Sequence, residues 1–296
     1  AKCGTFSFIL PPFSVKKPRM AIDVDLLAKI CKAPGAPGFE IEIRKLVLKE
    51  LKGLADDVRI DNMGNVVALK KGKDSSKKVM AAAHMDEIGF LVQNVTTDGF
   101  IQFLAVGGWW THTLLSQRVS VMTSTGKKIL GVVSSKPPHF LPEAQRKQVL
   151  PIEALFIDVG ASSREEAMEE FGIQLGDAIC PVSEFTAMEK EDYYMSKAFD
   201  NRVGMAGSIQ SHKELVESGH PNRLFSCGSV QEEVGLRGAL PLAQKVQPDV
   251  AIVLEGPPAD DTPGFSRADS QGKLGGGVQI RLFDPTAIAN PRLVKF

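Results

Sequence analysis

Helical patterns and short apolar runs alternate at both ends of this chain. In the helical patterns apolar residues recur every three or four positions, whereas the apolar runs are short and uninterrupted, as in strands buried on both faces. Helices are therefore predicted over residues 25–32, 40–51, 203–216 and 238–245. Strands are predicted over residues 58–60, 66–69, 79–83, 224–230 and 250–254, of which the last three are predicted to be buried. Strands that alternate with helices are typical of an α/β sheet.

The pattern changes between residues 88 and 180, where short alternating stretches are separated by turns rich in glycine and threonine. Strands are predicted over residues 90–92, 100–103, 119–121 and 129–133, with one brief helix over 163–171. Many short strands indicate a small β-barrel or a sandwich. We therefore expect residues 88–180 to form a β-rich domain inserted into an α/β domain, which residues 20–87 and 181–296 form together.

Composition excludes several classes of protein. The 296 residues carry 35 Lys plus Arg and 35 Asp plus Glu, so the formal net charge is zero. Proteins that bind nucleic acid or membrane surfaces normally carry a basic excess, so neither partner is expected. No apolar run approaches the roughly 20 residues that span a bilayer. A net charge of zero is compatible with self-assembly, since it gives little electrostatic repulsion between copies.

The four cysteines, Cys3, Cys31, Cys180 and Cys227, contain no Cys-x-x-Cys pair. This spacing argues against a zinc ribbon and a disulfide framework, and favours reduced thiols in the cytoplasm. The first 19 residues have an apolar stretch followed by basic residues, which reverses the order of a signal peptide. Met20 resembles a natural start. Residues 1–19 are therefore predicted to be a leader or an added extension.

His84 and Asp86 follow the predicted strand 79–83. In an extended segment, residues two apart point to the same side, so the Asp86 carboxylate can lie beside the imidazole of His84. A carboxylate on the far ring nitrogen fixes the tautomer of a metal-binding histidine. A single histidine is more often a core or surface residue, but this spacing at a strand end favours a functional role.

Glu232 and Glu233 follow the predicted strand 224–230, among Gly228, Gly235 and Gly238. Adjacent side chains on an extended chain diverge, so one carboxylate can bind a metal ion while the other accepts a proton from metal-bound water. The glycines indicate a tightly bent backbone. The alternative is an acidic turn in solvent, which is the commoner use of two adjacent glutamates.

Asp200 and Glu255 are weaker candidates taken singly. Asp200 could cap the helix that follows it, and Glu255 could be the solvated end of the strand 250–254. Ligand-type side chains at successive strand ends nevertheless favour one shared site, because the carboxyl ends of parallel strands meet at one edge of an α/β sheet. The pattern predicts a hydrolase that activates water with two metal ions.

These motifs resemble those of the glutamyl and deblocking aminopeptidases, dinuclear metallopeptidases that include the tetrahedral aminopeptidases. The resemblance extends over nearly all of residues 20–296. Its motifs are His84-Met85-Asp86-Glu87-Ile88-Gly89, Ala198-Phe199-Asp200-Asn201-Arg202, Gln231-Glu232-Glu233-Val234-Gly235-Leu236-Arg237-Gly238 and Asp261-Thr262-Pro263-Gly264. The resemblance implies a three-layer α/β/α catalytic domain with an inserted small β-barrel domain, and a homo-oligomer such as a dodecamer, which that second domain helps to assemble.

The resemblance also implies a role for each candidate residue. Asp200 would bridge two divalent ions, zinc or cobalt, roughly 3.5–4 Å apart. His84 and Glu255 would complete one metal site, and Glu233 would belong to the other. Glu232 would be the general base, and Asp86 would orient His84.

Two departures from the family pattern stand out. Position 255 is Glu where many relatives have Asp. The family's last metal ligand is a histidine in a glycine-rich segment, and none of His112, His139, His212 and His220 lies in such a context. We therefore expect that a C-terminal segment beyond Phe296 is omitted from this sequence.

The leading hypothesis is a cytoplasmic, metal-dependent aminopeptidase that removes N-terminal residues from peptides through a water bridging two metal ions. A glucanase-type hydrolase is one alternative, since some relatives bear that label. A catalytically incomplete subunit for assembly or binding is another. The preferred N-terminal residue cannot be predicted from the sequence.

Overall fold

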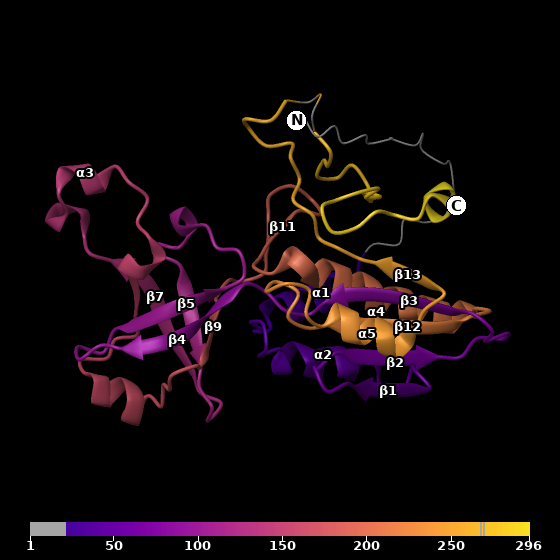
Figure 1. Cartoon of the computed structure of the whole chain (residues 1–296), viewed down its shortest axis with the longest axis horizontal. Coiled ribbons are helices and arrows are strands. Elements are labelled where there is room, and N and C mark those ends of the chain that lie inside the picture. Colours follow the sequence, from indigo (N-terminus) through magenta and orange to yellow (C-terminus); the bar gives the residue numbers. More distant parts are fainter. Residues whose placement is uncertain (1–21, 267, 269) are drawn as a thin grey trace. The chain divides into compact units, whose positions relative to one another are not determined.

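The computed structural model of the protein describes residues 22–266, 268 and 270–296 (Figure 1). These residues belong to two compact units, a larger one up to Gly256 and a smaller one that begins at Pro257. The predicted leader, residues 1–19, and Cys3 lie outside the described residues. The division into an α/β domain and an inserted domain concerns the larger unit and stays a prediction.

The larger unit contains a five-stranded sheet in the order β1-β2-β12-β3-β13. Its strands are β1 (Asp57–Ile60), β2 (Val66–Lys70), β3 (Lys78–His84), β12 (Arg223–Ser229) and β13 (Val250–Val253). Strands β12, β3 and β13 run parallel, whereas β1 and β2 pair antiparallel with each other and β2 with β12. Each strand lies within about a residue of its predicted range, because the apolar runs are bounded by polar or turn residues.

Helices cover both faces of this sheet (Figure 1). The helices are α1 (Val24–Lys32), α2 (Ile41–Leu51), α4 (Phe199–Ser218) and α5 (Ala239–Val246). Val66 and Ala68 point to the core with α1, α2 and α4, whereas the intervening Val67 packs in a second core with α5. This alternation follows from the two-residue period of a strand. The prediction of an α/β/α arrangement is confirmed.

Residues between β3 and α4 form a closed barrel in the order β4-β5-β8-β7-β6-β9. Its strands are β4 (Gly89–Val95), β5 (Ile101–Val106), β6 (Arg118–Met122), β7 (Lys128–Ser135), β8 (Leu155–Asp158) and β9 (Ala178–Pro181). Alternate residues such as Phe90 and Val92 fill its interior. Strand β9 pairs with both β4 and β6 and thereby closes the barrel. The predicted barrel is confirmed, although the sequence did not indicate β8 and β9.

Shorter elements decorate the barrel and lead to α4. They are η1 (Thr111–Thr113), η2 (Pro138–Phe140), α3 (Glu143–Arg146), η3 (Ile152–Ala154), the π-helical η4 (Glu166–Glu170), and the paired strands β10 (Thr186–Ala187) and β11 (Tyr194–Met195). The predicted brief helix over 163–171 corresponds to η4. The cysteines Cys31, Cys180 and Cys227 are buried free thiols.

The prediction that strand 250–254 is buried is wrong. Ile252 is 52% exposed and Val253 is 69% exposed. Strand β13 is the edge of the sheet and pairs only with β3 within the described residues. An apolar run therefore predicted the strand but not its neighbours, because periodicity carries no information about strand order.

The smaller unit, residues 257–296, consists mainly of loops. Phe283 and Ile288 form an isolated bridge, and α6 (Pro291–Lys295) begins where the Asn290 side chain accepts a hydrogen bond from the Arg292 amide. Asp260 accepts hydrogen bonds from the amides of Gln271 and Gly272 and so closes a loop. Within the part of the chain that the structure describes, no helix has the length and apolar composition needed to cross a membrane.

His212 is a buried titratable group in α4 that is not among the candidate site residues. Its Nδ1 lies 2.9 Å from Ser226 Oγ, and its Nε2 has no hydrogen-bond partner among the described residues. Burial lowers the pKa of His212, and repulsion from His220 and Lys70 adds to the shift. The unfolded chain then binds more protons below the ordinary histidine pKa of about 6.5, so protonation favours unfolding there.

We predict that the melting temperature of the chelator-treated protein falls more steeply between pH 7 and pH 5 than that of a His212→Gln variant, because the variant lacks this proton uptake. Thermal melts at a series of pH values measure the two slopes. His139→Gln, an exposed histidine of η2, serves as the control and should keep the wild-type slope. Parallel curves for wild type and His212→Gln would rule out this source of pH dependence.

Candidate metal centre

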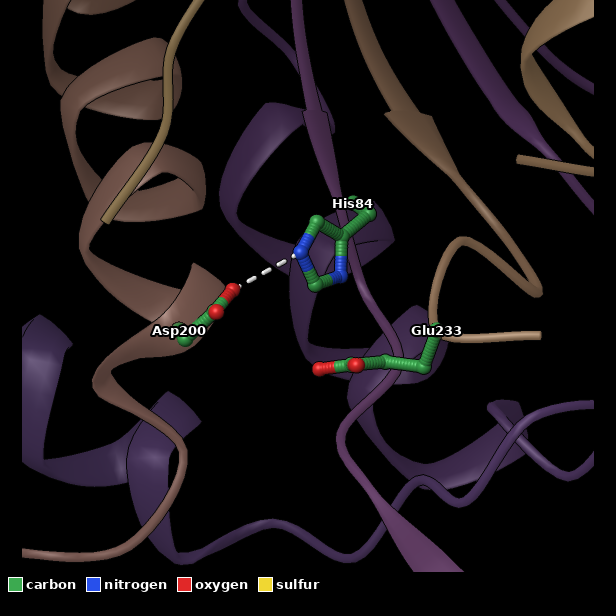
Figure 2. A group of neighbouring side chains, drawn as sticks. All are labelled: His84, Asp200 and Glu233. Carbon is green, nitrogen blue, oxygen red and sulfur yellow. Dashed lines mark hydrogen bonds and ion pairs between the residues drawn. The ribbon is translucent and has the colours of Figure 1, made fainter. Parts of the chain in front are cut away.

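The candidate site lies where parallel strands of the larger unit end. Strand β3 ends at His84, the loop after β12 carries Glu232 and Glu233, and Glu255 follows β13. Because β3, β12 and β13 are parallel, their carboxyl ends meet at one edge of the sheet. The first turn of α4 brings Asp200 to the same edge (Figure 2).

The imidazole of His84 is the centre of this cluster. Its Nε2 lies 2.9 Å from Asp200 Oδ1, 3.5 Å from Glu255 Oε1 and 3.8 Å from Glu232 Oε2. Figure 2 shows the carboxylates of Asp200 and Glu233 approaching the ring from different elements. Ligand atoms of His84, Asp200 and Glu233 lie within 4.8 Å of one another, and so do those of His84, Glu232 and Glu255. All the metal-ligand candidates from the sequence therefore converge, while their individual roles stay predictions.

Asp86 contacts His84 in two ways. Its main-chain oxygen lies 3.1 Å from His84 Nδ1, and its carboxylate Oδ1 lies 3.5 Å from the same nitrogen. A carbonyl oxygen only accepts hydrogen bonds, so Nδ1 is the donor and Nε2 is the nitrogen left to bind a metal ion. The predicted orienting role of Asp86 thus has a geometric basis in which the backbone takes part.

Burial and the neighbouring charges shift the pKa values of three groups in the cluster, His84, Glu233 and Glu232. Burial by itself lowers the pKa of His84, but hydrogen bonds with the surrounding carboxylates, that of Asp200 foremost, raise the pKa to about 12. Burial raises the pKa of Glu233 to about 7, and repulsion from Asp200 adds to that shift. Burial also raises the pKa of Glu232. A group of carboxylates this close together favours either the binding of protons or the binding of a metal cation.

The donor set fits a divalent metal ion. It consists of one imidazole nitrogen and carboxylate oxygens, with no thiolate among them. Imidazole and carboxylate together suit zinc and similar first-row divalent ions, whereas soft ions prefer sulfur ligands. The residues that would hold the ions are His84, Asp200, Glu233 and Glu255, with Glu232 beside them.

The loop that carries the two glutamates is held through its successive backbone amides, which donate to side chains elsewhere in the chain. The amides of Glu232 and Glu233 donate to Oδ1 and Oδ2 of Asp86, each at 3.0 Å. The Gln231 amide donates to Glu40 at 3.1 Å, and the Val230 amide donates to Asn65 Oδ1 at 3.0 Å. Side chains from three other segments therefore fix residues 230–233.

Asn65 is itself held on both sides. Its Nδ2 donates to Asp61 Oδ2 at 2.7 Å and to the Gly238 carbonyl at 3.0 Å. A Cβ atom at Gly238 would lie 2.5 Å from Asn65 Oδ1, so only glycine fits there. Residues 61–65, between the predicted strands 58–60 and 66–69, resemble an ordinary turn, and Glu40 at the start of a predicted helix was not among the candidate site residues. The only sequence signal was a polar turn beside apolar strands, which does not reveal burial.

Asn201 connects Asp200 to the neighbouring strand end. Its Nδ2 donates to the Leu254 carbonyl at 2.8 Å, and its Oδ1 accepts from the Gly204 amide at 3.0 Å. Leu254 precedes Glu255, so this side chain couples the positions of two candidate ligands. The bond from the Gly204 amide to Asn201 Oδ1 has the spacing of a helix N-cap, so Asn201 caps the regular part of α4 and the Asp200 carboxylate contacts His84 instead.

A buried cluster of charged side chains lies next to the candidate site. Lys197 Nζ donates to both carboxylate oxygens of Glu87 at 2.6 and 2.8 Å. Arg202 lies 3.7 Å from Glu87 Oε1 and donates to the Ile30 carbonyl at 2.6 Å. These contacts join the segment after β3 to the start of α4, which carries Asp200.

A sheet of this kind, with a histidine and carboxylates gathered at the carboxyl ends of its parallel strands, defines a class of metal-dependent hydrolases. Comparison with known proteins narrows the class. The model of the M42 glutamyl aminopeptidase family matches residues 64–296. The chain therefore belongs to this family.

Individual proteins similar to this chain also bear aminopeptidase names. FrvX of Escherichia coli (strain K12) is 40% identical over 275 residues, which are 92% of this chain and 75% of that protein. The lysyl aminopeptidase of Pyrococcus furiosus is 38% identical over 79% of this chain and 66% of its own length. The glutamyl aminopeptidase of Lactococcus lactis is 33% identical over 92% of this chain and 76% of its own length.

Solved structures share the fold. The TET aminopeptidase of a marine sediment Thaumarchaeota archaeon has a TM-score of 0.82 and 39% identity, covering 86% of this chain and 70% of that one. PhTET1-12s, a dodecamer in its crystal, has a TM-score of 0.79 and 31% identity over 92% of this chain and 78% of that one. An endoglucanase of Thermotoga maritima has a TM-score of 0.69 and 33% identity over 85% of this chain and 72% of that one.

The chain is a metal-dependent aminopeptidase, and the glucanase alternative has no better support.

We predict that Asn65→Ala lowers kcat with little change in KM, because it removes the acceptor of the Val230 amide and loosens the loop of Glu232 and Glu233. A misplacement of about 1 Å can cost roughly 100-fold in rate. Hydrogen exchange should accelerate at the amides of residues 230–233, which a purely global loss of stability would not single out.

Asn62→Ala, in the exposed part of the same turn, is the matched control and should behave like wild type. Steady-state kinetics and exchange mass spectrometry measure the two effects. Wild-type kcat in Asn65→Ala, or faster exchange spread evenly over the sheet, would contradict the positioning role.

Proposed function

We propose that this aminopeptidase removes N-terminal residues from peptides with the help of two divalent ions held by His84, Asp200, Glu233 and Glu255. The observation that carries the proposal is the convergence of carboxylates from α4 and from the ends of β12 and β13 on the imidazole that ends β3. Zinc or cobalt suits this mixture of nitrogen and oxygen donors.

Glu232 is the proposed general base. Its carboxylate lies 3.8 Å from His84 Nε2, and burial raises its pKa toward the range in which a carboxylate accepts a proton readily. Bound divalent ions supply Lewis acidity and bring the pKa of a water to near 7. Glu232 accepts the proton of the attacking water and returns it to the leaving amine. The Asp86 carboxylate accepts a hydrogen bond from the Glu232 amide and so positions the backbone of the proposed base.

Glu255 stands where the family resemblance leads us to expect an aspartate. Its Oε1 reaches to 3.5 Å from His84 Nε2, and its other contact is with its neighbour, the Gly256 amide, at 3.0 Å. The longer side chain therefore still reaches the cluster. This contact supports its proposed place as a ligand.

The assembly and location of the enzyme complete the proposal. The TET relatives favour a homo-oligomer, and we propose a dodecamer as its form. The substrates are peptides, with no nucleic acid or membrane partner. A cytoplasmic location is supported by the buried free thiols of Cys31, Cys180 and Cys227, since free cysteines persist in reducing compartments.

Glu232→Gln should reduce kcat by roughly 100-fold to 10,000-fold, the usual contribution of a general base, while bound metal stays near the wild-type amount. Turnover of an aminoacyl-nitroanilide and elemental analysis measure the two quantities. Glu217→Gln, on the exposed end of α4, is the control and should keep full activity. Unchanged turnover in Glu232→Gln would eliminate this base.

Removal of divalent ions with a chelator should abolish aminopeptidase activity, and zinc or cobalt should restore it. Glycosidases of the usual kind need two carboxylates and no transition metal, so cellulose hydrolysis that survives chelation would favour the glucanase alternative. Fewer than two bound metal ions per chain, with cleavage of neither substrate, would favour the catalytically incomplete assembly or binding subunit.

A further inference from the structure

A cavity of about 360 Å³ lies against the metal centre within the larger unit. Asp200 and Glu233 form the wall on the side of the centre, and Trp109, Thr113 and Gln117 come from the barrel. In Figure 2 the carboxylates of Asp200 and Glu233 face each other across the site. A ligand bound at these two residues therefore has the cavity directly beside it.

The other charged residues of the wall, Lys197 and Glu87, have no free capacity for a ligand. An ammonium group has three donors, and Lys197 Nζ uses them on Glu87 Oε1, Glu87 Oε2 and the Ala33 carbonyl at 2.6, 2.8 and 3.3 Å. Glu87 also has Arg202 at 3.7 Å, and its side chain is only 3% exposed. Neither group is available to pair with a charged substrate.

The rest of the wall is uncharged. Ile88, Gly108, Pro181 and Ala198 contribute apolar or backbone surface. The indole of Trp109 is fixed, because its Nε1 donates to the Gly89 carbonyl at 2.9 Å and its ring stacks on Phe90 at 4.6 Å.

The two polar barrel residues of the wall offer little to an ion. Thr113 Oγ1 already donates to the Trp110 carbonyl at 2.8 Å, and Gln117 carries only a neutral amide. Apart from the carboxylates of Asp200 and Glu233, which the proposed function assigns to the metal ions, this wall offers a charged side chain no free ion to pair with.

We propose that this cavity receives the side chain of the substrate's N-terminal residue and selects uncharged residues over acidic and basic ones. The inference rests on the proposed function. In an N-terminal residue the amino group, the side chain and the scissile carbonyl all start from one Cα, so the side chain enters the space next to the groups that hold the other two. The family alone leaves charge preference open, since its members include enzymes named for lysyl and for glutamyl substrates.

The test uses the full metal-loaded chain and two series of dipeptide amides. The first series varies the N-terminal residue among Leu, Met, Gln, Glu and Lys before a constant Ala, and the second varies the following residue after a constant Leu. We expect kcat/KM for uncharged N-terminal residues to exceed that for Glu and Lys by about 10-fold, because the wall supplies apolar contact but no free partner for a charge. Equal or better cleavage of Glu or Lys, or discrimination at the second residue instead, would overturn the proposal.

A variant with a charged residue in the wall tests whether this cavity determines the preference for charge. Gln117→Lys should raise the ratio of Glu to Leu cleavage by about 10-fold and lower the ratio of Lys to Leu, because the new ammonium pairs with an acidic side chain and repels a basic one. Gln148→Lys, on an exposed part of the barrel outside this cavity, is the matched control and should leave both ratios unchanged. Ratios that do not move in Gln117→Lys, or that move equally in both variants, would contradict the assignment.

A binding measurement separates this inference from the proposed function. Leucinol, lysinol and the amino alcohol of glutamate carry the amino group and side chain but no scissile bond, and calorimetry gives their affinities. Tighter binding of leucinol without any peptide cleavage would sustain the cavity assignment and defeat the aminopeptidase mechanism. Cleavage with equal binding of all three would defeat the cavity assignment alone, and neither binding nor cleavage would defeat both.

Discussion

One side chain, that of Asp86, connects the parts of the site that come from different strands. Its carboxylate accepts the amides of Glu232 and Glu233, and its carbonyl faces His84 Nδ1. Two hydrogen bonds to Asp86 therefore join the segment after β3 to the loop after β12, and a third, within the first segment, orients His84. Asp86 is completely buried, so these bonds are shielded from water and the loss of the carboxylate would leave two amides unpaired. The geometry of the remaining ligands depends on this junction.

The arrangement brings anions together at an electrostatic cost. Carboxylates that converge on one imidazole repel one another. Burial, with repulsion from Asp200 added to it, raises the pKa of Glu233 to about 7. A cation relieves that repulsion, either as protons or as metal ions, and the two compete. Metal binding should therefore weaken as the pH falls. Hydrogen bonds of Glu40, Asn65 and Asn201 with the backbone near the ligands oppose a separation of the carboxylates by loop movement.

Much of this architecture was predictable from the sequence, for identifiable reasons. Strand ends are visible as the transition from apolar runs to His84, Glu232 and Glu255, and parallel strands place such ends together. Partners distant in the chain were not predictable. Asn65 and Glu40 resemble ordinary loop residues until the fold brings residues 230–233 to them. Strands β8 and β9 lack a long alternating pattern, and the exposure of β13 depends on which strands flank it.

Anomalous diffraction from crystals of the metal-loaded protein would locate the ions relative to the side chains of the candidate site. We expect two metal peaks among His84, Asp200, Glu233 and Glu255, one of them within bonding distance of His84 Nε2. Metal ions bound elsewhere on the chain, or a fully loaded protein with no peak within bonding distance of His84 Nε2, would contradict this expectation.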